Sequence, residues 1–396
     1  EVTEDLGNPP FDLGILLVND ADAGESSFLA GNYNGTYGTV ALTAAGSYTY
    51  TLNNSDLLVQ SLGAGITATD TVAVQSFDGS THNVTVTITG VNDVAVVGGD
   101  DQGSVTEDDD PLTLTDSGIL TVADVDTGEA EFNPETIAGT YGSLTIDALG
   151  NWTYSADNTP LTIQQLGATA TLTETLTVST IDGTTHNVNV VINGTNDAAI
   201  IGGVDTGSVK EEDDPVTLTA SGALTISDID LGEEVFNANT TPGLYGSLTI
   251  DALGNWTYSA DNTLPAIQAL GEGSSLIDTI TIQSIDGTTH DVTLTINGTN
   301  DAALISVGVL PTVTEDDAPV TLTGLGTINI TDVDTGESQF NPGNINGLDG
   351  TLTLDAAGHA SYSADNTQAV IQARGAGSTV SDTSTSTSVD GTTVDV

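Results

Sequence analysis

Residues 171–193 read TLTETLTVSTIDGTTHNVNVVIN and carry the clearest structural signal in the chain. Apolar side chains stand at every second position on both sides of the pair Asp182-Gly183: Leu176, Val178, Val188, Val190 and Ile192. An alternation of period two that is rich in β-branched residues and is interrupted by Asp-Gly is typical of a β-hairpin. The stretch therefore predicts two antiparallel strands joined by a tight turn.

This hairpin belongs to a unit that recurs every 104 residues, as the spacing of one phenylalanine shows: Phe28, Phe132, Phe236 and Phe340. A fixed period reduces a long chain to one short fold repeated several times. A unit of this length has an ordinary size for one compact domain. We predict four domains, at residues 1–93, 94–197, 198–301 and 302–396, and expect the fourth to be truncated and degenerate. Catalytic constellations seldom come in tandem, so we expect no enzyme.

The rest of the unit is also predicted to be short strands. A second hairpin is expected around residues 147–151, with Trp152 and Tyr154 on its second arm. Only residues 158–167 favour a helix, because an asparagine cap, an early proline and a closing glycine suit one or two turns. Short strands with turns every 8–12 residues are typical of a β-sandwich. The predicted fold class is all-β, with antiparallel immunoglobulin-like β-sandwiches in a linear array.

The fourth unit lacks several side chains that we expect in the core. The replacements are Tyr245 by Asp349, Trp256 by Ala360, Leu270 by Arg374, Ile280 by Ser384 and Ile282 by Ser386. Each lost side chain costs about 1.5–3 kcal/mol of burial. We expect this unit to be either the weakest of the four or an atypical terminal repeat.

The charge balance is extreme, with 56 acidic residues against Lys210 and Arg374 and a formal net charge of −54. This charge excludes direct binding to the phosphate backbone of nucleic acids. It also implies strong self-repulsion, which is relieved either by salt, with a screening length of about 8 Å, or by divalent cations at fixed carboxylates. Cysteine is absent, so no disulfide or thiolate metal site is expected. No run of 18 apolar residues exists, so we expect no membrane insertion.

Three acidic motifs recur once per unit and supply the candidate metal ligands. An acidic pair on the opening strand contributes Glu4, Glu107, Asp108, Glu211 and Glu315. A D-x-D-x-G-E loop contributes Asp20, Asp22 and Glu25; Asp124, Asp126 and Glu129; Asp228, Asp230 and Glu233; and Asp332, Asp334 and Glu337. An Asn-Asp pair at the end of the unit contributes Asn92, Asp93, Asn196, Asp197, Asn300 and Asp301.

Calcium takes six to eight oxygen ligands from carboxylates, amides and carbonyls. Alternate aspartates on a loop direct both carboxylates one way, and the junction residues join them only where neighbouring units meet end to end. We therefore predict Ca²⁺ ions at the junctions between domains. The alternative is that Asp, Asn and Gly only form turns. We favour that alternative for the isolated Asp-Gly turns at Asp78, Asp182 and Asp286 and for Asp147.

The histidines, the paired carboxylates and the tryptophans are better explained by structural roles than by catalytic or sugar-binding sites. His82, His186 and His290 share one place in the hairpin without a nucleophile nearby, so we expect surface residues. Glycoside hydrolysis by paired carboxylates needs an acid in an apolar cleft, whereas these acids lie beside other acids. Trp152 and Trp256 are able to stack on sugars, but their alternating strand positions favour the core.

The unit V-T-E-D … D-V-D-T-G-E … Y-G-S-L-T-I-D-A-L-G-N-W-T-Y-S-A-D-N … D-G-T-T-H … G-T-N-D resembles the VCBS repeat of giant bacterial adhesins of the repeats-in-toxin (RTX) group, over essentially the whole chain. Its acidic junctions resemble those of cadherins, where such residues hold calcium. The resemblance also implies a further carboxylate ligand before the penultimate strand, at Asp70, Glu174, Asp278 and Asp382.

The resemblance implies a calcium-stiffened extracellular stalk, secreted or on the bacterial cell surface, that serves attachment or biofilm cohesion. Its expected partners are the neighbouring repeats of the same chain, and a host or abiotic surface reached through regions outside this sequence. The alternative is a self-assembling extracellular filament or matrix subunit, in which homotypic chains bundle through calcium and edge strands.

Overall fold

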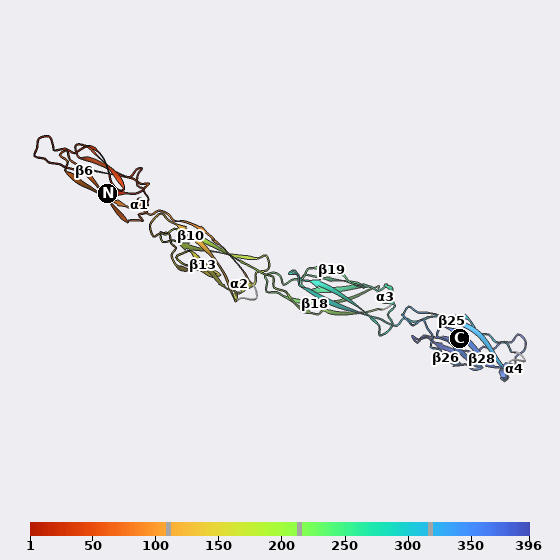
Figure 1. The fold of residues 1–396 in the computed structure, drawn as a ribbon. Helices are drawn as coiled ribbons and strands as arrows, with labels where there is room; N and C mark the ends of the chain where they lie inside the picture. The colour runs from red at the N-terminus through yellow and green to blue at the C-terminus, as the bar shows by residue number, and fades with distance from the viewer. Residues whose placement is uncertain (108–111, 212–215, 316–319) are drawn as a thin grey trace. The chain divides into compact units, whose positions relative to one another are not determined.

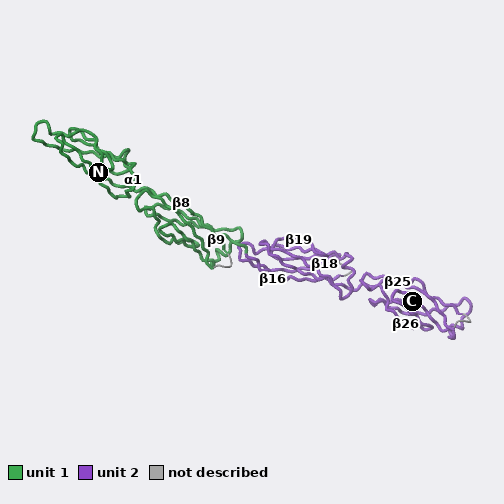
Figure 2. Tube along the Cα trace, viewed as in Figure 1, with its two compact units in different colours: residues 1–196 green, residues 197–396 purple. Residues whose placement is uncertain are grey.

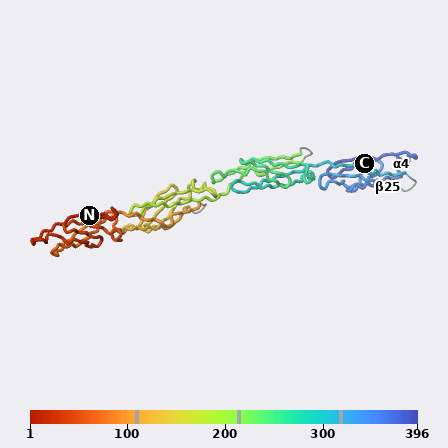
Figure 3. The backbone as a smooth tube through the Cα atoms, turned by 90° about the horizontal axis from the view of Figure 1, so that it is seen from above, coloured from red at the N-terminus to blue at the C-terminus, as the bar shows by residue number. Residues whose placement is uncertain are grey.

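The computed structural model of the chain describes residues 1–107, 112–211, 216–315 and 320–396. The described residues form two compact units, Glu1–Asn196 and Asp197–Val396 (Figure 2). Each unit holds two copies of the repeated fold in successive stretches of chain, as the colours in Figure 3 show. The structure is almost entirely β, which confirms the predicted fold class.

The second repeat shows the full architecture, two facing sheets (Figure 1). One sheet has the order β11-β12-β13-β10-β8, and the other has the order β14-β15-β9. The elements are β8 (Val96–Gly99), β9 (Gln102–Thr106), β10 (Thr113–Ala123), β11 (Glu135–Ala138), β12 (Gly142–Ile146), β13 (Asn151–Asp157), α2 (Leu161–Gln164), β14 (Thr171–Ser179) and β15 (Thr185–Asn193).

The first repeat has the sheets β2-β5-β4-β3 and β1-β7-β6. Its elements are β1 (Val2–Thr3), β2 (Phe11–Ile15), β3 (Gly31–Asn34), β4 (Gly38–Leu42), β5 (Ser47–Leu52), α1 (Leu57–Gln60), β6 (Thr67–Gln75) and β7 (Thr81–Thr89). Strand β2 pairs with β5, and its counterpart β10 pairs with β13 and with the linker strand β8.

The third repeat matches the second, with the sheets β16-β18-β21-β20-β19 and β17-β23-β22. Its elements are β16 (Ile200–Gly203), β17 (Thr206–Lys210), β18 (Thr217–Ser227), β19 (Asn239–Pro242), β20 (Gly246–Ile250), β21 (Asn255–Asp261), α3 (Pro265–Gln268), β22 (Ser275–Gln283) and β23 (Thr289–Asn297).

The fourth repeat keeps the sheet β24-β25-β28-β27-β26, but its other sheet is only the pair β29-β30. The elements are β24 (Leu304–Val309), β25 (Thr321–Thr331), β26 (Gly343–Asn346), β27 (Gly350–Leu354), β28 (His359–Asp365), α4 (Ala369–Gln372), β29 (Thr385–Thr387) and β30 (Thr393–Asp395). Its buried apolar residues fall into two small clusters, in line with the predicted loss of core side chains.

The core of each complete repeat lies between its two sheets. In the second repeat, Trp152, Tyr154 and Phe132 are fully buried together with the alternating residues of β14 and β15. The register of β14 with β15 confirms the predicted hairpin around Asp182-Gly183, and that of β12 with β13 confirms the one around 147–151.

The sequence-based description of the sandwich is wrong in two details. The opening strand of each complete repeat pairs parallel to the closing strand, as β9 does with β15, so the sandwich is not purely antiparallel. A parallel pair needs a long connection, and here the rest of the repeat supplies it. The predicted helix is present as a single turn, within the expected length, but its N-cap is Pro160 rather than an asparagine.

Candidate metal centres

The D-x-D-x-G-E loop has the same local geometry in all four repeats. Oδ1 of the first aspartate accepts a hydrogen bond of 2.8–2.9 Å from the backbone N–H of the second, as Asp124 does from Asp126. Such an Asx turn explains why aspartate stands first. This turn uses only one of the two carboxylate oxygens of the first aspartate. The other oxygen is buried without a hydrogen-bond partner in three loops, as Oδ2 of Asp124, Asp228 and Asp332.

In three of the loops, the second aspartate holds the linker that precedes its own repeat. Oδ2 of Asp126 accepts from the backbone N–H of Asp93 at 2.8 Å. The same bond joins Asp230 to Asp197 at 2.9 Å and Asp334 to Asp301 at 2.8 Å. Oδ1 of each of these acceptors is buried without a hydrogen-bond partner. The loop therefore positions the linker and leaves unpaired carboxylate oxygens beside it.

The opening strand supplies a buried glutamate at the other end of the repeat. The parallel pairing of β1 with β7 places Glu4 beside the end of the closing strand, where its Oε1 accepts from Val91 N–H at 2.9 Å. Glu4 is only 1% exposed, and its Oε2 has no hydrogen-bond partner. Glu107 and Glu211 are equally buried and accept bonds from Thr195 and Thr299 at the same place.

The last glutamate of the loop lies against the repeat that precedes it. A Cβ atom added to Gly63 would lie 2.5 Å from Oε1 of Glu129, and one added to Gly271 would lie 2.7 Å from Oε1 of Glu337. The backbone adds a bond between repeats, from Thr127 N–H to the carbonyl of Ser61 at 3.1 Å. Thr335 makes the corresponding bond to Ala269. Glycine thus lets the glutamate approach the neighbouring backbone closely.

Within residues 1–196, the structure brings together one predicted set of ligands around the first linker: Glu4, Asp93, Asp124, Asp126 and Glu129. Within residues 197–396 it brings together a second set: Glu211, Asp301, Asp332, Asp334 and Glu337. Asn92 and Asn300 lie in these linkers, where each side chain donates to the carbonyl of the next residue.

Four of the remaining predicted ligands lie near one another in the second compact unit: Asp197, Asp228, Asp230 and Glu233. Glu107 and Asn196 belong to the first compact unit. Asp20, Asp22 and Glu25 gather on their own loop, with carboxylate oxygens within 4.8 Å of one another. Glu315 is half-exposed in a segment without strand structure. Asp108 lies outside the described residues.

Basic side chains that could compensate the clustered carboxylates are scarce, since the sequence has only Lys210 and Arg374 against 56 acidic residues. Burial and the nearby charges of Asp126 and Asp124 raise the pKa of Glu129, and burial and Asp126 raise that of Asp93. Burial and Asp332 likewise raise the pKa of Asp334, although its bond from Asp301 opposes the shift. Lys210 is exposed next to the buried Glu211. Buried anionic oxygens without partners are costly, and hard oxygen ligands of this kind suit calcium.

The sequence favours a purely local role for the Asp-Gly turns, but Asp182 and Asp286, and the equivalent Asp390, also contact the linkers. Oδ2 of Asp182, Asp286 and Asp390 accepts from the backbone N–H of Ala95, Ala199 and Ala303, respectively. The charges of Asp182 and Asp286 also contribute to the raised pKa values of Glu129 and Glu233. The sequence holds one signal for this contact: the turn aspartates recur with the same 104-residue period as the candidate ligands.

The carboxylates expected before the penultimate strand lie within that strand in the first three repeats, and their role differs from the one that the family resemblance implied. Asp70 accepts from Tyr50 Oη at 2.8 Å and from the backbone N–H groups of Thr36 and Tyr37. Glu174, Asp278 and Asp382 make the equivalent bonds to Tyr154, Tyr258 and Tyr362. These donors all lie within the same repeat, so these carboxylates hold the β3–β4 turn and its counterparts.

The aromatic and histidine residues also take structural places. Trp152 and Trp256 are 1% exposed and donate their indole N–H groups to the carbonyls of Asp100 and Val204, which leaves no face for a sugar. His186 is half-buried and lies 3.2 Å from Asp101 in the turn between β8 and β9. The core position predicted for the tryptophans is confirmed. Of the histidines predicted to lie on the surface, His82 is exposed, whereas His186 and His290 are half-buried.

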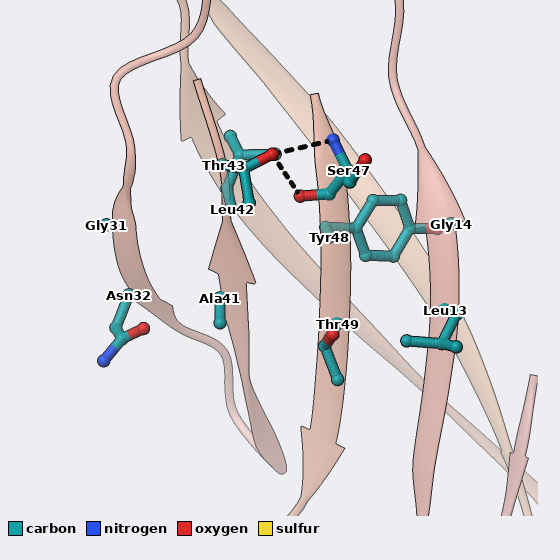
Figure 4. Close-up of a pocket in the computed structure, with 10 residues that line it drawn as sticks. All are labelled: Leu13, Gly14, Gly31, Asn32, Ala41, Leu42, Thr43, Ser47, Tyr48 and Thr49. Atoms are coloured by element: carbon teal, nitrogen blue, oxygen red, sulfur yellow. Dashed lines mark hydrogen bonds between the residues drawn. The ribbon is translucent and has the colours of Figure 1, made fainter. Parts of the chain in front are cut away.

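An open hollow of about 540 Å³ lies on the β2-β5-β4-β3 sheet of the first repeat (Figure 4). In Figure 4 the ring of Tyr48 extends toward Gly14 of the neighbouring strand. Four apolar side chains along this edge are exposed: Phe11 by 59%, Leu13 by 64%, Ile15 by 65% and Leu17 by 90%. The second repeat has Thr115, Ser117, Ile119 and Thr121 at the same positions.

Helices among the described residues are all too short or too polar to cross a membrane. A family model described as a bacterial cadherin-like domain matches residues 1–90, 92–194 and 196–298. No curated protein sequence matches the chain.

Several solved structures are similar to the chain. Protocadherin gammaB7 domains EC3-6 are 13% identical, with 100% of this chain and 95% of that chain covered at a TM-score of 0.42. Drosophila N-cadherin EC1-4 is 13% identical, with 96% and 92% covered at a TM-score of 0.31. A Ca²⁺-stabilized ice-binding adhesin of an Antarctic bacterium is 18% identical, with 98% and 92% covered at a TM-score of 0.26.

Proposed function

The chain belongs to the family of bacterial cadherin-like domains, and on this basis we propose that it is an extracellular adhesive repeat region whose repeat junctions bind calcium. The observation that carries the proposal is the set of buried carboxylate oxygens without hydrogen-bond partners beside the linkers, such as Oε2 of Glu4 and Oδ1 of Asp126. In a protein with a net charge of −54 and only two basic side chains, few side-chain cations exist to neutralise these oxygens.

The proposed role follows from which repeat each ligand belongs to. Glu4 comes from the first repeat, Asp93 from the linker, and Asp126 and Glu129 from the second repeat. Calcium would supply the positive charge that lets these oxygens stay close together. A ligand that binds only the docked arrangement stabilises that arrangement by RT ln(1 + [L]/Kd). Calcium at millimolar concentration would therefore favour a stiff junction, and a chelator would favour a flexible one.

In this proposal the region is the stalk of a large secreted bacterial surface adhesin of the VCBS and RTX type and has no enzymatic activity. The stalk serves surface attachment or biofilm cohesion. Its partners are its own neighbouring repeats, and a host or abiotic surface bound by other regions of the adhesin. The four tandem copies of one fold and the repeated acidic linkers support this view, because a spacer needs repetition and stiff joints rather than a single pocket.

Titration calorimetry tests the proposal directly. The protein is stripped with a chelator, dialysed, and titrated with calcium chloride and separately with magnesium chloride. We expect saturable calcium binding at more than one site per chain, with weaker binding of magnesium because that smaller ion demands a tighter octahedral shell. A featureless calcium titration would reject the proposal.

A second candidate function is lateral self-association into an extracellular filament or matrix, and one observation favours it. Strand β2 lies at one end of the sheet β2-β5-β4-β3 and carries the exposed apolar side chains of Phe11, Leu13 and Ile15. An exposed apolar edge of this kind promotes pairing between chains. Light scattering coupled to size-exclusion chromatography distinguishes the candidates: concentration-dependent oligomers that the L13S and I15S substitutions abolish support assembly, and a monomer at all concentrations rejects it.

A further inference from the structure

Three aspartates in Asp-Gly turns each hold a backbone amide of the linker that precedes their repeat. The bonds run from Ala95 to Asp182 at 3.1 Å, from Ala199 to Asp286 at 3.1 Å and from Ala303 to Asp390 at 2.9 Å. In each case the donor stands two residues after the aspartate of the Asn-Asp pair. Each bond therefore fixes a linker residue to a hairpin that lies 87 residues later in the chain.

The hairpin itself fixes the position of the accepting carboxylate. Oδ1 of Asp286 accepts from the hydroxyl of Ser284 and from the backbone N–H of Thr288, and Oδ2 accepts from the hydroxyl of Thr288. Asp78 has the same set of turn bonds, from Ser76 and Ser80. A donor 87 residues before Asp78 would precede Glu1, so this turn shows the hairpin bonds by themselves. These bonds form without a linker amide, so the linker contact is additional to what the turn requires.

Along the first linker, the hydrogen-bond acceptor changes from one repeat to the next. Val91 donates to Glu4 of the first repeat at 2.9 Å, whereas Asp93 donates to Asp126 of the second at 2.8 Å. Ala95 also donates to the second repeat, at Asp182. The linker amides therefore change from an acceptor in the first repeat to acceptors in the second repeat at Asn92.

The third linker has the same arrangement within the second compact unit. Thr299 donates to Glu211 of the third repeat at 3.0 Å, whereas Asp301 donates to Asp334 of the fourth at 2.8 Å. Ala303 donates to Asp390, also of the fourth repeat. In both linkers, side-chain acceptors of the downstream repeat hold two backbone amides, and the residue before the Asn-Asp pair is held upstream.

We propose that Asp182, Asp286 and Asp390 are positioning residues that keep each linker on the repeat that follows it, with or without a cation. The first and third junctions then flex at Asn92 and Asn300, where the acceptor changes. Each linker aspartate stays beside its D-x-D loop when the junction bends, so most of the ligand set is preorganised on the downstream side. The holding of the linker can be tested in the metal-free chain, and only its consequence for the ligand set rests on the proposed calcium binding.

Amide hydrogen exchange measured by NMR in excess chelator tests this inference on the full chain. The variant Asp182→Asn retains one acceptor oxygen for the turn but places an amide group toward Ala95 N–H. We expect exchange at Ala95 to become at least tenfold faster, with exchange at Val91 unchanged. Asp78→Asn, which alters the same turn without a linker contact, should change neither amide. Equal exchange at Ala95 in Asp182→Asn and the unmodified protein would overturn the inference.

A second variant covers the case in which Asp182→Asn unfolds its repeat. In that case Asp286→Asn is used, and hydrogen exchange is measured at the backbone amide of Ala199. We expect the same acceleration, and an unchanged exchange rate at Ala199 would overturn the inference. Backbone ¹⁵N relaxation of the unmodified protein in chelator tests the flexing point. We expect lower order parameters at Asn92 than at Asp93 and Ala95. If Asp93 and Ala95 are as mobile as Asn92, the linker is not held and the inference fails.

Discussion

The backbone N–H of Asp93 lies 2.8 Å from Oδ2 of Asp126, so a carboxylate 33 residues downstream holds the linker between the first two repeats. The other oxygen of Asp126 is buried and has no hydrogen-bond partner. One side chain thus combines a structural contact with an unpaired anionic oxygen. The same combination recurs at Asp230 and Asp334, which makes the junction chemistry a property of the repeat.

The substitution Asp126→Asn should weaken calcium binding at the first junction. It removes a full negative charge from a set that would otherwise share one ion, and loss of such a ligand is expected to reduce affinity by at least tenfold, about 1.4 kcal/mol. Titration calorimetry measures the change. Asp147→Asn is the matched control in the same repeat, because Asp147 only closes the exposed β12–β13 turn. Equal losses in both variants would show that the effect is not specific to the junction.

The substitution Gly63→Ala should weaken the same junction without unfolding either repeat. Its Cβ would lie 2.5 Å from Oε1 of Glu129, which is the end of a flexible side chain and therefore swings away at little cost to folding. We expect the calcium-induced rise in Tm to shrink while Tm in chelator stays the same. Gly375, at the same place in the fourth repeat, has open space around it, so Gly375→Ala should have no effect. A calcium response that survives Gly63→Ala would contradict this account.

The fourth repeat should unfold before the second and third. It has Ala360 where they have the buried Trp152 and Trp256, and a change from Trp to Ala in a core costs about 3–5 kcal/mol. The only two tryptophans of the chain report on the second and third repeats. Far-UV circular dichroism should therefore begin to change at a lower temperature than tryptophan fluorescence. Coincident melting curves would show that the four repeats unfold together.

The contribution of Asp286 to stability should disappear in acid. Burial opposes its ionisation, but the hydrogen bonds from Ser284 and Thr288 prevail and lower its pKa from 3.8 to about 2. A lowered pKa means that the ionised form stabilises the fold, so this stability is complete above pH 3.8 and is lost as the pH falls through about 2. In chelator, the difference in Tm between the unmodified protein and Asp286→Asn should follow this course. A difference that grows toward pH 2 would contradict it.

The strands could be predicted from sequence because their signal is local. The alternation through Val188, Val190 and Ile192 and the turn at Asp182-Gly183 determine a hairpin without reference to the rest of the chain. The parallel pairing of β9 with β15 could not be predicted in this way. Those strands are separated by most of the repeat, and only the closing of the sandwich brings them together.

The candidate ligands could be found by their period, but their individual roles could not. Asp182 looks like a turn residue because a turn explains it locally, and only the folded structure shows its bond to Ala95. Asp70 looks like a ligand by resemblance, yet Tyr50 and two backbone amides of its own repeat surround it. In both cases the deciding contact comes from residues more than 15 positions away, beyond the reach of a local motif.

Small-angle X-ray scattering of the chain in millimolar calcium and then in excess chelator tests the central claim most directly, because calcium-bound junctions must restrict bending. Asp126→Asn combined with Asp334→Asn is the comparison, since it removes one proposed ligand from the first and third junctions. We predict that the unmodified protein is more extended and less heterogeneous in calcium than in chelator, and that the double variant responds much less. Identical profiles of the unmodified protein under both conditions would contradict the account, because the junction carboxylates would then have no calcium-dependent role.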